Sequence, residues 1–191
     1  MRRRHVLLLA SAAMLAACGD RKPQFNAVDL TGADYAKDFQ LPDTDGKVRT
    51  LQDFKGKAVI VFFGYTQCPD VCPTTMADIA QAKKLLGADG AKVQGIFITI
   101  DPERDTPELL KAYVANFGPD FVALRGTPEQ TAAVAKDFMV YYKKVEGKGG
   151  NYTMDHSAAS FVYDPQGRLR LYARYGAGPQ VLADDLKQLL A

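Results

Sequence analysis

Two cysteines in one short loop, placed between an apolar run and a helical pattern, constrain the fold of this chain most. The apolar run Ala58–Phe63 is followed by Cys-Pro-Asp-Val-Cys-Pro at positions 68–73. A residue before proline avoids helical backbone, so we predict a helix over Thr74–Leu86 with Pro73 at its first position and Cys72 as its N-cap. The positive end of the helix dipole would then stabilise the Cys72 thiolate. Two thiols on a strand-to-helix loop are typical of dithiol redox chemistry or of soft-metal binding.

The first 17 residues have the pattern of a targeting segment. Three arginines at positions 2–4 precede the apolar stretch Val6–Leu15, which is too short to span a membrane comfortably. The run Leu-Ala-Ala-Cys at 15–18 resembles a bacterial lipobox and makes Cys18 the lipidated first residue of the mature chain. An ordinary secretory signal and an uncleaved N-terminal anchor are the alternatives. We therefore expect an exported lipoprotein on the periplasmic side of the inner membrane.

Composition favours one folded domain behind this leader. The chain has 191 residues, of which 47% are hydrophobic and 24% charged, an ordinary globular mixture. The formal net charge is only +2, and no basic stripe with interleaved aromatic residues indicates nucleic-acid binding. We expect a signal peptide over 1–17, a lipid-attached tether over 18–36 and a single domain over 37–191.

The order of predicted elements is similar to that of the thioredoxin fold. Strands are expected at Ala58–Phe63, Val93–Ile100, Phe121–Leu124 and Val140–Val145, and hairpins at Phe39–Leu51 and, from Ala159–Tyr163 with Leu169–Ala173, near the C-terminus. Further helices are expected from Pro107 to before Gly118, from Pro128 to about Phe138, and over Leu182–Leu190. These elements predict an α/β thioredoxin-like fold, a central mixed sheet flanked by helices, with an added N-terminal β-hairpin and a middle insertion. Such sheets place their sites at the carboxyl ends of strands.

His156 is the candidate third member of the site. It is the only histidine outside the leader, because the other is His5. In this topology His156 enters the strand Ala159–Tyr163 beside the cysteine loop, where Asp155 and Ser157 could orient its ring. Taken alone it would be an ordinary solvated loop histidine. Two thiolates and one imidazole suit copper and leave an open position, and zinc with a bound water is the alternative.

Three separated motifs together resemble the Sco/SenC family. They are Cys-Pro-Asp-Val-Cys-Pro at 68–73, Asp-Pro-Glu-Arg-Asp-Thr-Pro-Glu at 101–108 and Tyr-Thr-Met-Asp-His-Ser at 152–157. The resemblance runs from about Phe39 to the C-terminus. It implies a membrane-tethered thioredoxin-fold protein outside the cytoplasm, with a copper site made by Cys68, Cys72 and His156. Many relatives carry a transmembrane helix, whereas this chain offers a lipobox.

The resemblance also implies a function and partners. It implies copper delivery to, or maturation of, the binuclear copper centre of cytochrome c oxidase. The partners would be the oxidase subunit that holds this centre and an upstream copper donor protein. An open position would let an incoming ligand take the metal by exchange, and oxidation of Cys68 and Cys72 to a disulfide would switch the carrier off.

Other functions and ligands remain open from the residues alone. A periplasmic thiol–disulfide oxidoreductase that keeps partner cysteines reduced is the main alternative, although the three-residue cysteine spacing and the absence of proline near His156 favour metal. A peroxidase and a Cys–His hydrolase lack their usual motifs. Asp70 or Asp155 could add a carboxylate ligand, and Met154 could face the site, while Met76 is expected in the core. Residues 101–108 are either a partner-docking loop or plain loop and cap chemistry, with Arg104 neutralising its acidic neighbours.

Overall fold

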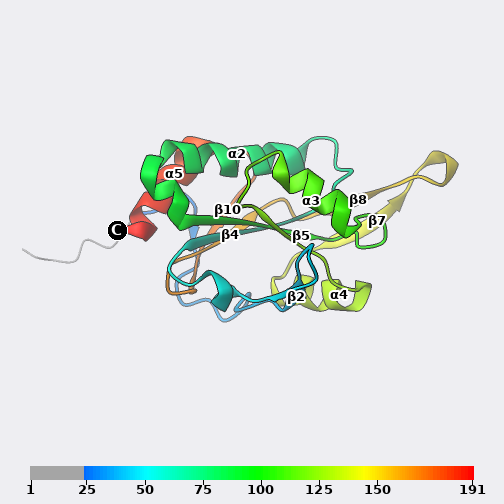
Figure 1. Ribbon diagram of the computed structural model, residues 1–191, viewed down its shortest axis with the longest axis horizontal. Coiled ribbons are helices and arrows are strands. Elements are labelled where there is room, and N and C mark those ends of the chain that lie inside the picture. The colour runs from blue at the N-terminus through cyan, green and yellow to red at the C-terminus, as the bar shows by residue number, and fades with distance from the viewer. Residues whose placement is uncertain (1–23) are drawn as a thin grey trace, which may run out of the picture.

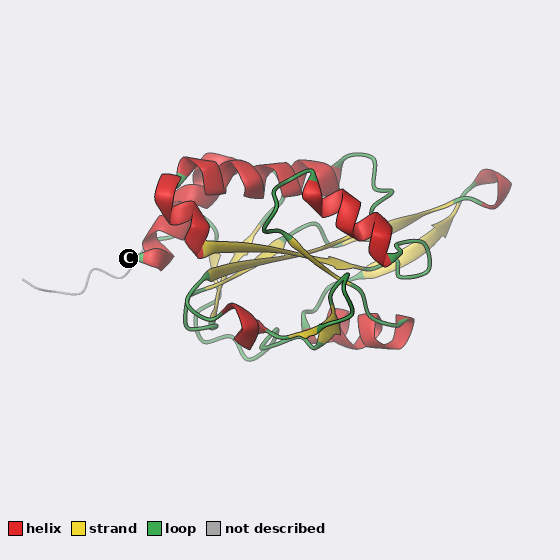
Figure 2. Cartoon of the chain, viewed as in Figure 1, coloured by secondary structure: helices red, strands yellow, loops and turns green. Residues whose placement is uncertain are grey.

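A computed structural model describes residues 24–191 of the chain; the predicted leader and Cys18 lie outside the described residues. A six-stranded sheet forms the centre of the molecule (Figures 1 and 2). In spatial order its strands are β1 (Val28–Asp29), β10 (Leu169–Ala173), β9 (Ser160–Tyr163), β4 (Ala58–Gly64), β5 (Val93–Thr99) and β6 (Val122–Leu124).

The two central strands are apolar along their whole length, and this pattern explains their position. Every residue of β4 and of β5 is buried. The two strands run parallel, in a register that pairs Ala58 with Val93 and Gly64 with Thr99, while β9 pairs antiparallel with the other edge of β4. A near-continuous apolar strand is typical of a sheet covered on both faces.

Helices cover both faces of this mixed sheet (Figure 1). The helices α2 (Val71–Leu85), α3 (Pro107–Ala115) and α5 (Pro179–Leu190) lie on one face, and α4 (Pro128–Asp137) lies on the other with the hairpin of β2 (Leu41–Pro42) and β3 (Val48–Arg49). Two short 3₁₀ helices complete the body, η1 (Leu51–Phe54) and η2 (Gly87–Lys92). The predicted thioredoxin-like α/β arrangement with an added N-terminal hairpin is confirmed.

Two helix starts follow the predicted combination of threonine and proline. The hydroxyl of Thr106 accepts from the Leu109 amide at 3.3 Å before α3, and the hydroxyl of Thr127 accepts from the Gln130 amide at 3.2 Å before α4. In α4 the Gln130 side chain also accepts from the Thr127 amide, which completes a capping box. These caps satisfy amides that the first helical turn leaves without partners.

The start of α2 differs from the prediction. The helix begins at Val71 with Asp70 as its N-cap, so Cys72 is the second helical residue and Pro73 the third. Proline is tolerated throughout a first turn, because no intrahelical acceptor exists there for its missing N–H. Cys72 therefore adopts helical backbone despite the proline after it.

The folded domain begins before the predicted boundary at residue 37. Strand β1 pairs antiparallel with β10, and Ala36 is buried. The buried carboxylate of Asp185 on α5 accepts from the backbone amides of Asn26 and Ala27, both at 2.8 Å. Three contacts at different points therefore attach the described part of the expected tether to the domain.

The middle insertion is a β-ribbon that projects from the body (Figure 1). It consists of β7 (Tyr142–Glu146) and β8 (Tyr152–His156), which pair antiparallel as a separate two-stranded sheet and are joined through the short turn η3 (Lys148–Gly150). His156 is the last residue of β8, so the expectation that it enters the β9 strand is wrong. The missed strand β8, and not β9, presents the imidazole.

Candidate metal centre

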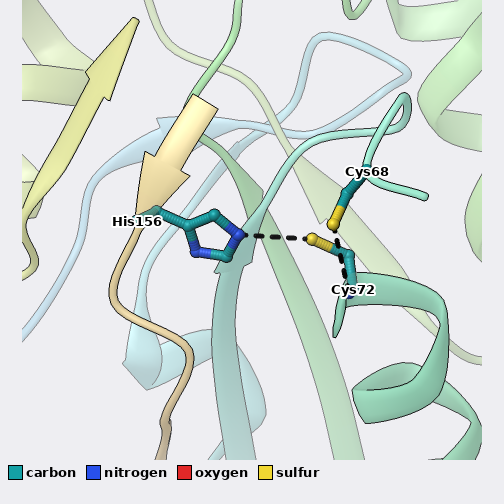
Figure 3. Close-up of side chains that lie close together, drawn as sticks. All are labelled: Cys68, Cys72 and His156. Atoms are coloured by element: carbon teal, nitrogen blue, oxygen red, sulfur yellow. Dashed lines mark hydrogen bonds between the residues drawn. The ribbon is translucent and has the colours of Figure 1, made fainter. Parts of the chain in front are cut away.

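The three predicted ligands lie together beside the carboxyl end of β4 (Figure 3). Cys68 comes from the loop after β4, Cys72 from the first turn of α2, and His156 from the end of β8. Their donor atoms all lie within 4.8 Å of one another. Two neighbouring cysteines and one histidine far along the chain therefore present two sulfurs and one imidazole to a common point, a group that could hold a metal ion.

Cys72 is the inner thiol of this group. Its side chain is buried, and its Sγ lies 3.5 Å from Nε2 of His156. Burial, followed by a hydrogen bond with Cys68, raises the pKa of the Cys72 thiol well above its ordinary value. The predicted stabilisation of a Cys72 thiolate by the helix start is therefore wrong for the metal-free protein, because burial disfavours the charged form of this thiol.

The backbone amide of Cys72, in the first turn of α2, faces Cys68. The backbone N–H of Cys72 donates to Sγ of Cys68 at 3.4 Å. Cys68 is partly exposed, whereas Cys72 is not. The pair thus consists of an outer sulfur near solvent and an inner sulfur against the imidazole.

One hydrogen bond sets the tautomer of His156. Its Nδ1 lies 2.8 Å from the carbonyl oxygen of Ser157. A carbonyl only accepts, so Nδ1 carries the hydrogen of the neutral ring and the lone pair is on Nε2. That lone pair faces Cys72, which is the orientation that a metal ligand requires.

Aromatic packing holds the imidazole in this orientation. The ring meets Phe62 edge-on at 6.1 Å between centroids and Tyr65 at 6.0 Å. Burial lowers the pKa of His156 below its ordinary value, against the smaller opposing effect of the Ser157 carbonyl. The ring is therefore neutral at pH 7 and has Nε2 free to bind.

Of the two residues expected to orient the His156 ring, Ser157 does so and Asp155 does not. Ser157 holds the ring through its carbonyl oxygen, while its hydroxyl accepts from the Tyr141 amide at 3.1 Å. Asp155 is exposed, because alternation along β8 points it to the opposite face of the ribbon. Neither Asp155 nor Asp70 belongs to the group of potential ligands in the described part of the chain.

Two of the methionines, Met76 and Met154, are both buried. Met76 lies in the core, as predicted. Met154 shares the face of β8 that carries His156, and it lines a cavity with Ile100 and Pro128. A role of its sulfur in the site stays a prediction.

Gly64 is a site residue that the sequence reasoning missed. A Cβ at this position would lie 2.9 Å from Sγ of Cys72 and 2.9 Å from the ring of Phe97. The bare backbone therefore makes room for the inner sulfur at the end of β4. A glycine that ends an otherwise bulky apolar strand was the available signal.

The loop of residues 101–105 packs beneath the cysteine loop. Asp105 is fully buried and accepts from the hydroxyls of Thr66 and Thr99, both at 2.5 Å. Burial raises the pKa of this carboxyl. Arg104 pairs with the buried Asp101, so the predicted neutralisation is confirmed for one acidic neighbour.

We expect Gly64→Ala to destabilise the domain through a clash with the inner sulfur. Overpacking of this kind costs about 1–3 kcal/mol. The cost should be smaller in a Cys72→Ala background, where the sulfur is gone and the contacts with the Phe97 and Phe62 rings remain. Urea unfolding of the wild-type protein, the two single variants and the double variant gives the free energies of unfolding from which both costs are obtained. Equal costs in the two backgrounds would show that Gly64 does not accommodate the sulfur.

Comparison with known proteins assigns the chain to a family. A family model described as SCO1/SenC matches residues 28–191. The SCO2-like protein of Rickettsia felis is 34% identical over 152 residues, which are 78% of this chain and 74% of the relative. The structure of Bradyrhizobium japonicum ScoI with copper bound is 44% identical, covers 80% of this chain and 98% of that chain, and has a TM-score of 0.73. The solution structure of apo Sco1 from Thermus thermophilus is 37% identical and has a TM-score of 0.78. The match covers 90% of this chain and 100% of that chain. This chain belongs to the SCO1/SenC family, as its three motifs indicated.

Proposed function

We propose that this protein binds a copper ion through Cys68, Cys72 and His156 and delivers it during assembly of cytochrome c oxidase. The observation that carries the proposal is the convergence of three soft donor atoms, with the Nε2 lone pair of His156 facing the inner thiol. The similarity to copper-bound structures of two relatives, at 44% and 33% identity, supports copper over zinc.

The donor set fits copper on chemical grounds. Thiolate and imidazole are soft or intermediate ligands that suit Cu(I), and a set of three leaves the low-coordinate geometry that this ion accepts. Copper would replace the thiol protons, because only deprotonated sulfur binds. Buried Cys72 and oriented His156 would hold the ion from the inner side, while partly exposed Cys68 lies where a partner can reach it.

This asymmetry supports delivery by ligand exchange. A thiolate or imidazole of the acceptor would bind at the open position, and the bond to the outer sulfur of Cys68 would break first. The proposed acceptor is the oxidase subunit that holds the binuclear copper centre, and the proposed source is an upstream copper donor protein. A fourth ligand from this chain would slow such an exchange.

The adjacent thiols also support a second candidate function. Cys68 and Cys72 are both free, and their sulfurs lie within 4.8 Å of each other. Thiol–disulfide exchange with a partner disulfide would reduce the partner and leave Cys68 and Cys72 joined. This reaction would keep partner cysteines ready for metal, and the resulting disulfide would remove both sulfur ligands.

We further propose that the domain is exported and held at the periplasmic face of the inner membrane by lipid on Cys18. Within residues 24–191 no helix combines the length and the apolarity needed to cross a bilayer. A SCO1/SenC family lipoprotein from Bacillus anthracis, 27% identical, supports this mode of attachment. The lipobox-like run at 15–18 is its basis in the sequence.

An anaerobic Cu(I) titration of the full chain against a competing chelator tests the copper site. We expect one copper ion per chain. Replacing any one of Cys68, Cys72 and His156 by alanine should lower the affinity by more than about 100-fold, beyond the effect of removing an outer hydrogen-bond partner. Cys18→Ala is the matched control and should leave the affinity unchanged. Weak binding that is insensitive to His156→Ala would contradict the site and favour the oxidoreductase.

Metabolic labelling with a radioactive fatty acid tests the proposed anchor. The wild-type chain should carry label and sediment with membranes, since the lipobox cysteine receives the lipid. Cys18→Ala should lose both properties, while Cys68→Ala should keep them. A Cys18→Ala protein that stays in the membrane fraction after an alkaline wash would instead indicate an uncleaved anchor.

A further inference from the structure

Arg104 contacts the two chain segments that carry Cys68 and His156. Its Nη1 donates to the carbonyl oxygen of Tyr152 at 2.8 Å and to Oε1 of Gln67 at 3.1 Å. Tyr152 is the first residue of β8, which ends at His156, and Gln67 directly precedes Cys68. One guanidinium group thus joins the strand that presents the imidazole to the loop that presents the outer thiol.

The guanidinium is itself held in a closed network. Its Nε donates to Oδ2 of Asp101, and the Tyr152 hydroxyl donates to Oδ1 of the same carboxylate at 2.8 Å. Its Cζ also lies 3.5 Å from the centre of the Tyr152 ring. Asp101 is only 3% exposed, so these charged contacts act where water screens them little. Arginine, tyrosine and aspartate therefore fix one another.

The β7–β8 ribbon needs such a connection more than the rest of the fold does. The ribbon is a separate two-stranded sheet and projects from the body (Figure 1). An isolated two-stranded hairpin is marginally stable at best. The position of the ribbon relative to the cysteine loop therefore depends on contacts between side chains of the ribbon and of the body. The Tyr152 side chain, at the start of β8, makes such contacts with Asp101 and Arg104.

The same arginine leaves one buried atom unsatisfied. Its Nη2 has no hydrogen-bond partner within the described residues. A buried N–H without a partner is costly, which reduces what this arginine contributes to stability. The unsatisfied group is a reason to look for a role of this arginine beyond simple packing.

We propose that Arg104 is a positioning residue that sets the distance between His156 and the cysteine loop, an inference that rests on the proposed copper site. It acts through Tyr152 and Gln67 and does not touch the metal. When the arginine is removed, the ribbon gains freedom to move and the imidazole contributes less to the site. The loss of copper affinity therefore depends on His156.

A double-mutant cycle on the full chain tests this role. Arg104→Met keeps most of the side-chain length but removes all five donors. We expect it to weaken Cu(I) affinity by about tenfold, as loss of an outer hydrogen-bond partner does. In a His156→Ala background the same substitution should have no further effect. Arg104→Lys keeps the charge without the planar fork and should show a smaller loss in the same His156-dependent way.

Amide hydrogen exchange of the metal-free protein gives a readout that does not involve copper. Exchange over residues 152–156 should accelerate in Arg104→Met, while β4 stays unchanged. The matched control is Arg168→Met. Arg168 pairs with Asp164 on the turn after β9, at the amino end of β4 and away from the cysteine loop. This control should change neither quantity.

The outcomes separate the two proposals. Unchanged affinity in Arg104→Met, an equal loss in the His156→Ala background, or unchanged exchange over 152–156 would each overturn the positioning role. A wild-type chain that binds no copper, or one whose affinity is insensitive to His156→Ala, would overturn the copper site. In that case hydrogen exchange alone still decides whether Arg104 holds the ribbon.

Discussion

The contact between the Cys72 thiol and the His156 imidazole is the constraint on which the site depends. The two groups come from segments far apart in the sequence, one from the first turn of α2 and one from the end of a projecting ribbon. A 3.5 Å separation between Sγ and Nε2 requires both segments to be placed accurately. Gly64 makes room for the sulfur, and the Ser157 carbonyl fixes the tautomer. The surrounding fold brings these two atoms together.

Burial shifts the pKa values of Cys72 and His156 in opposite directions, and both shifts favour the uncharged form of the group. It keeps the Cys72 thiol protonated and His156 neutral in the metal-free protein, because both charged forms are penalised in the interior. Neither Cys72 nor His156 therefore places a charge in the interior of the metal-free protein. A site of this kind accepts a soft cation readily once the thiols lose their protons, since the cation compensates the buried negative charge.

The sequence predicts much of the fold because local patterns and tertiary needs agree there. The apolar runs of β4 and β5, the Thr-Pro helix starts and the hairpin turns all lie close to their expected positions. The three residues of the proposed site were also indicated by the cysteine spacing, by the single histidine outside the leader and by the three motifs that resemble the Sco/SenC family. The three side chains converge in the structure, and the chain belongs to the SCO1/SenC family, which agrees with this prediction.

The errors arise where tertiary contacts override local preference. Helix α2 starts at Val71 despite the proline after Cys72, and β8 forms because β7 pairs with it. The early boundary follows from Asp185, a residue 158 positions from its Ala27 partner. This contact has no local signature, and neither do the contacts of Arg104 with Gln67 and Tyr152, since each depends on which segments the fold brings together.

X-ray absorption spectroscopy of the Cu(I)-loaded full chain tests the central claim most directly, because it reports the atoms bound to the metal. The account predicts two sulfur scatterers and one nitrogen scatterer per copper ion. It also predicts the loss of one sulfur in Cys72→Ala and of the nitrogen in His156→Ala. A first shell of oxygen and nitrogen without sulfur, or one that is unchanged by His156→Ala, would contradict it.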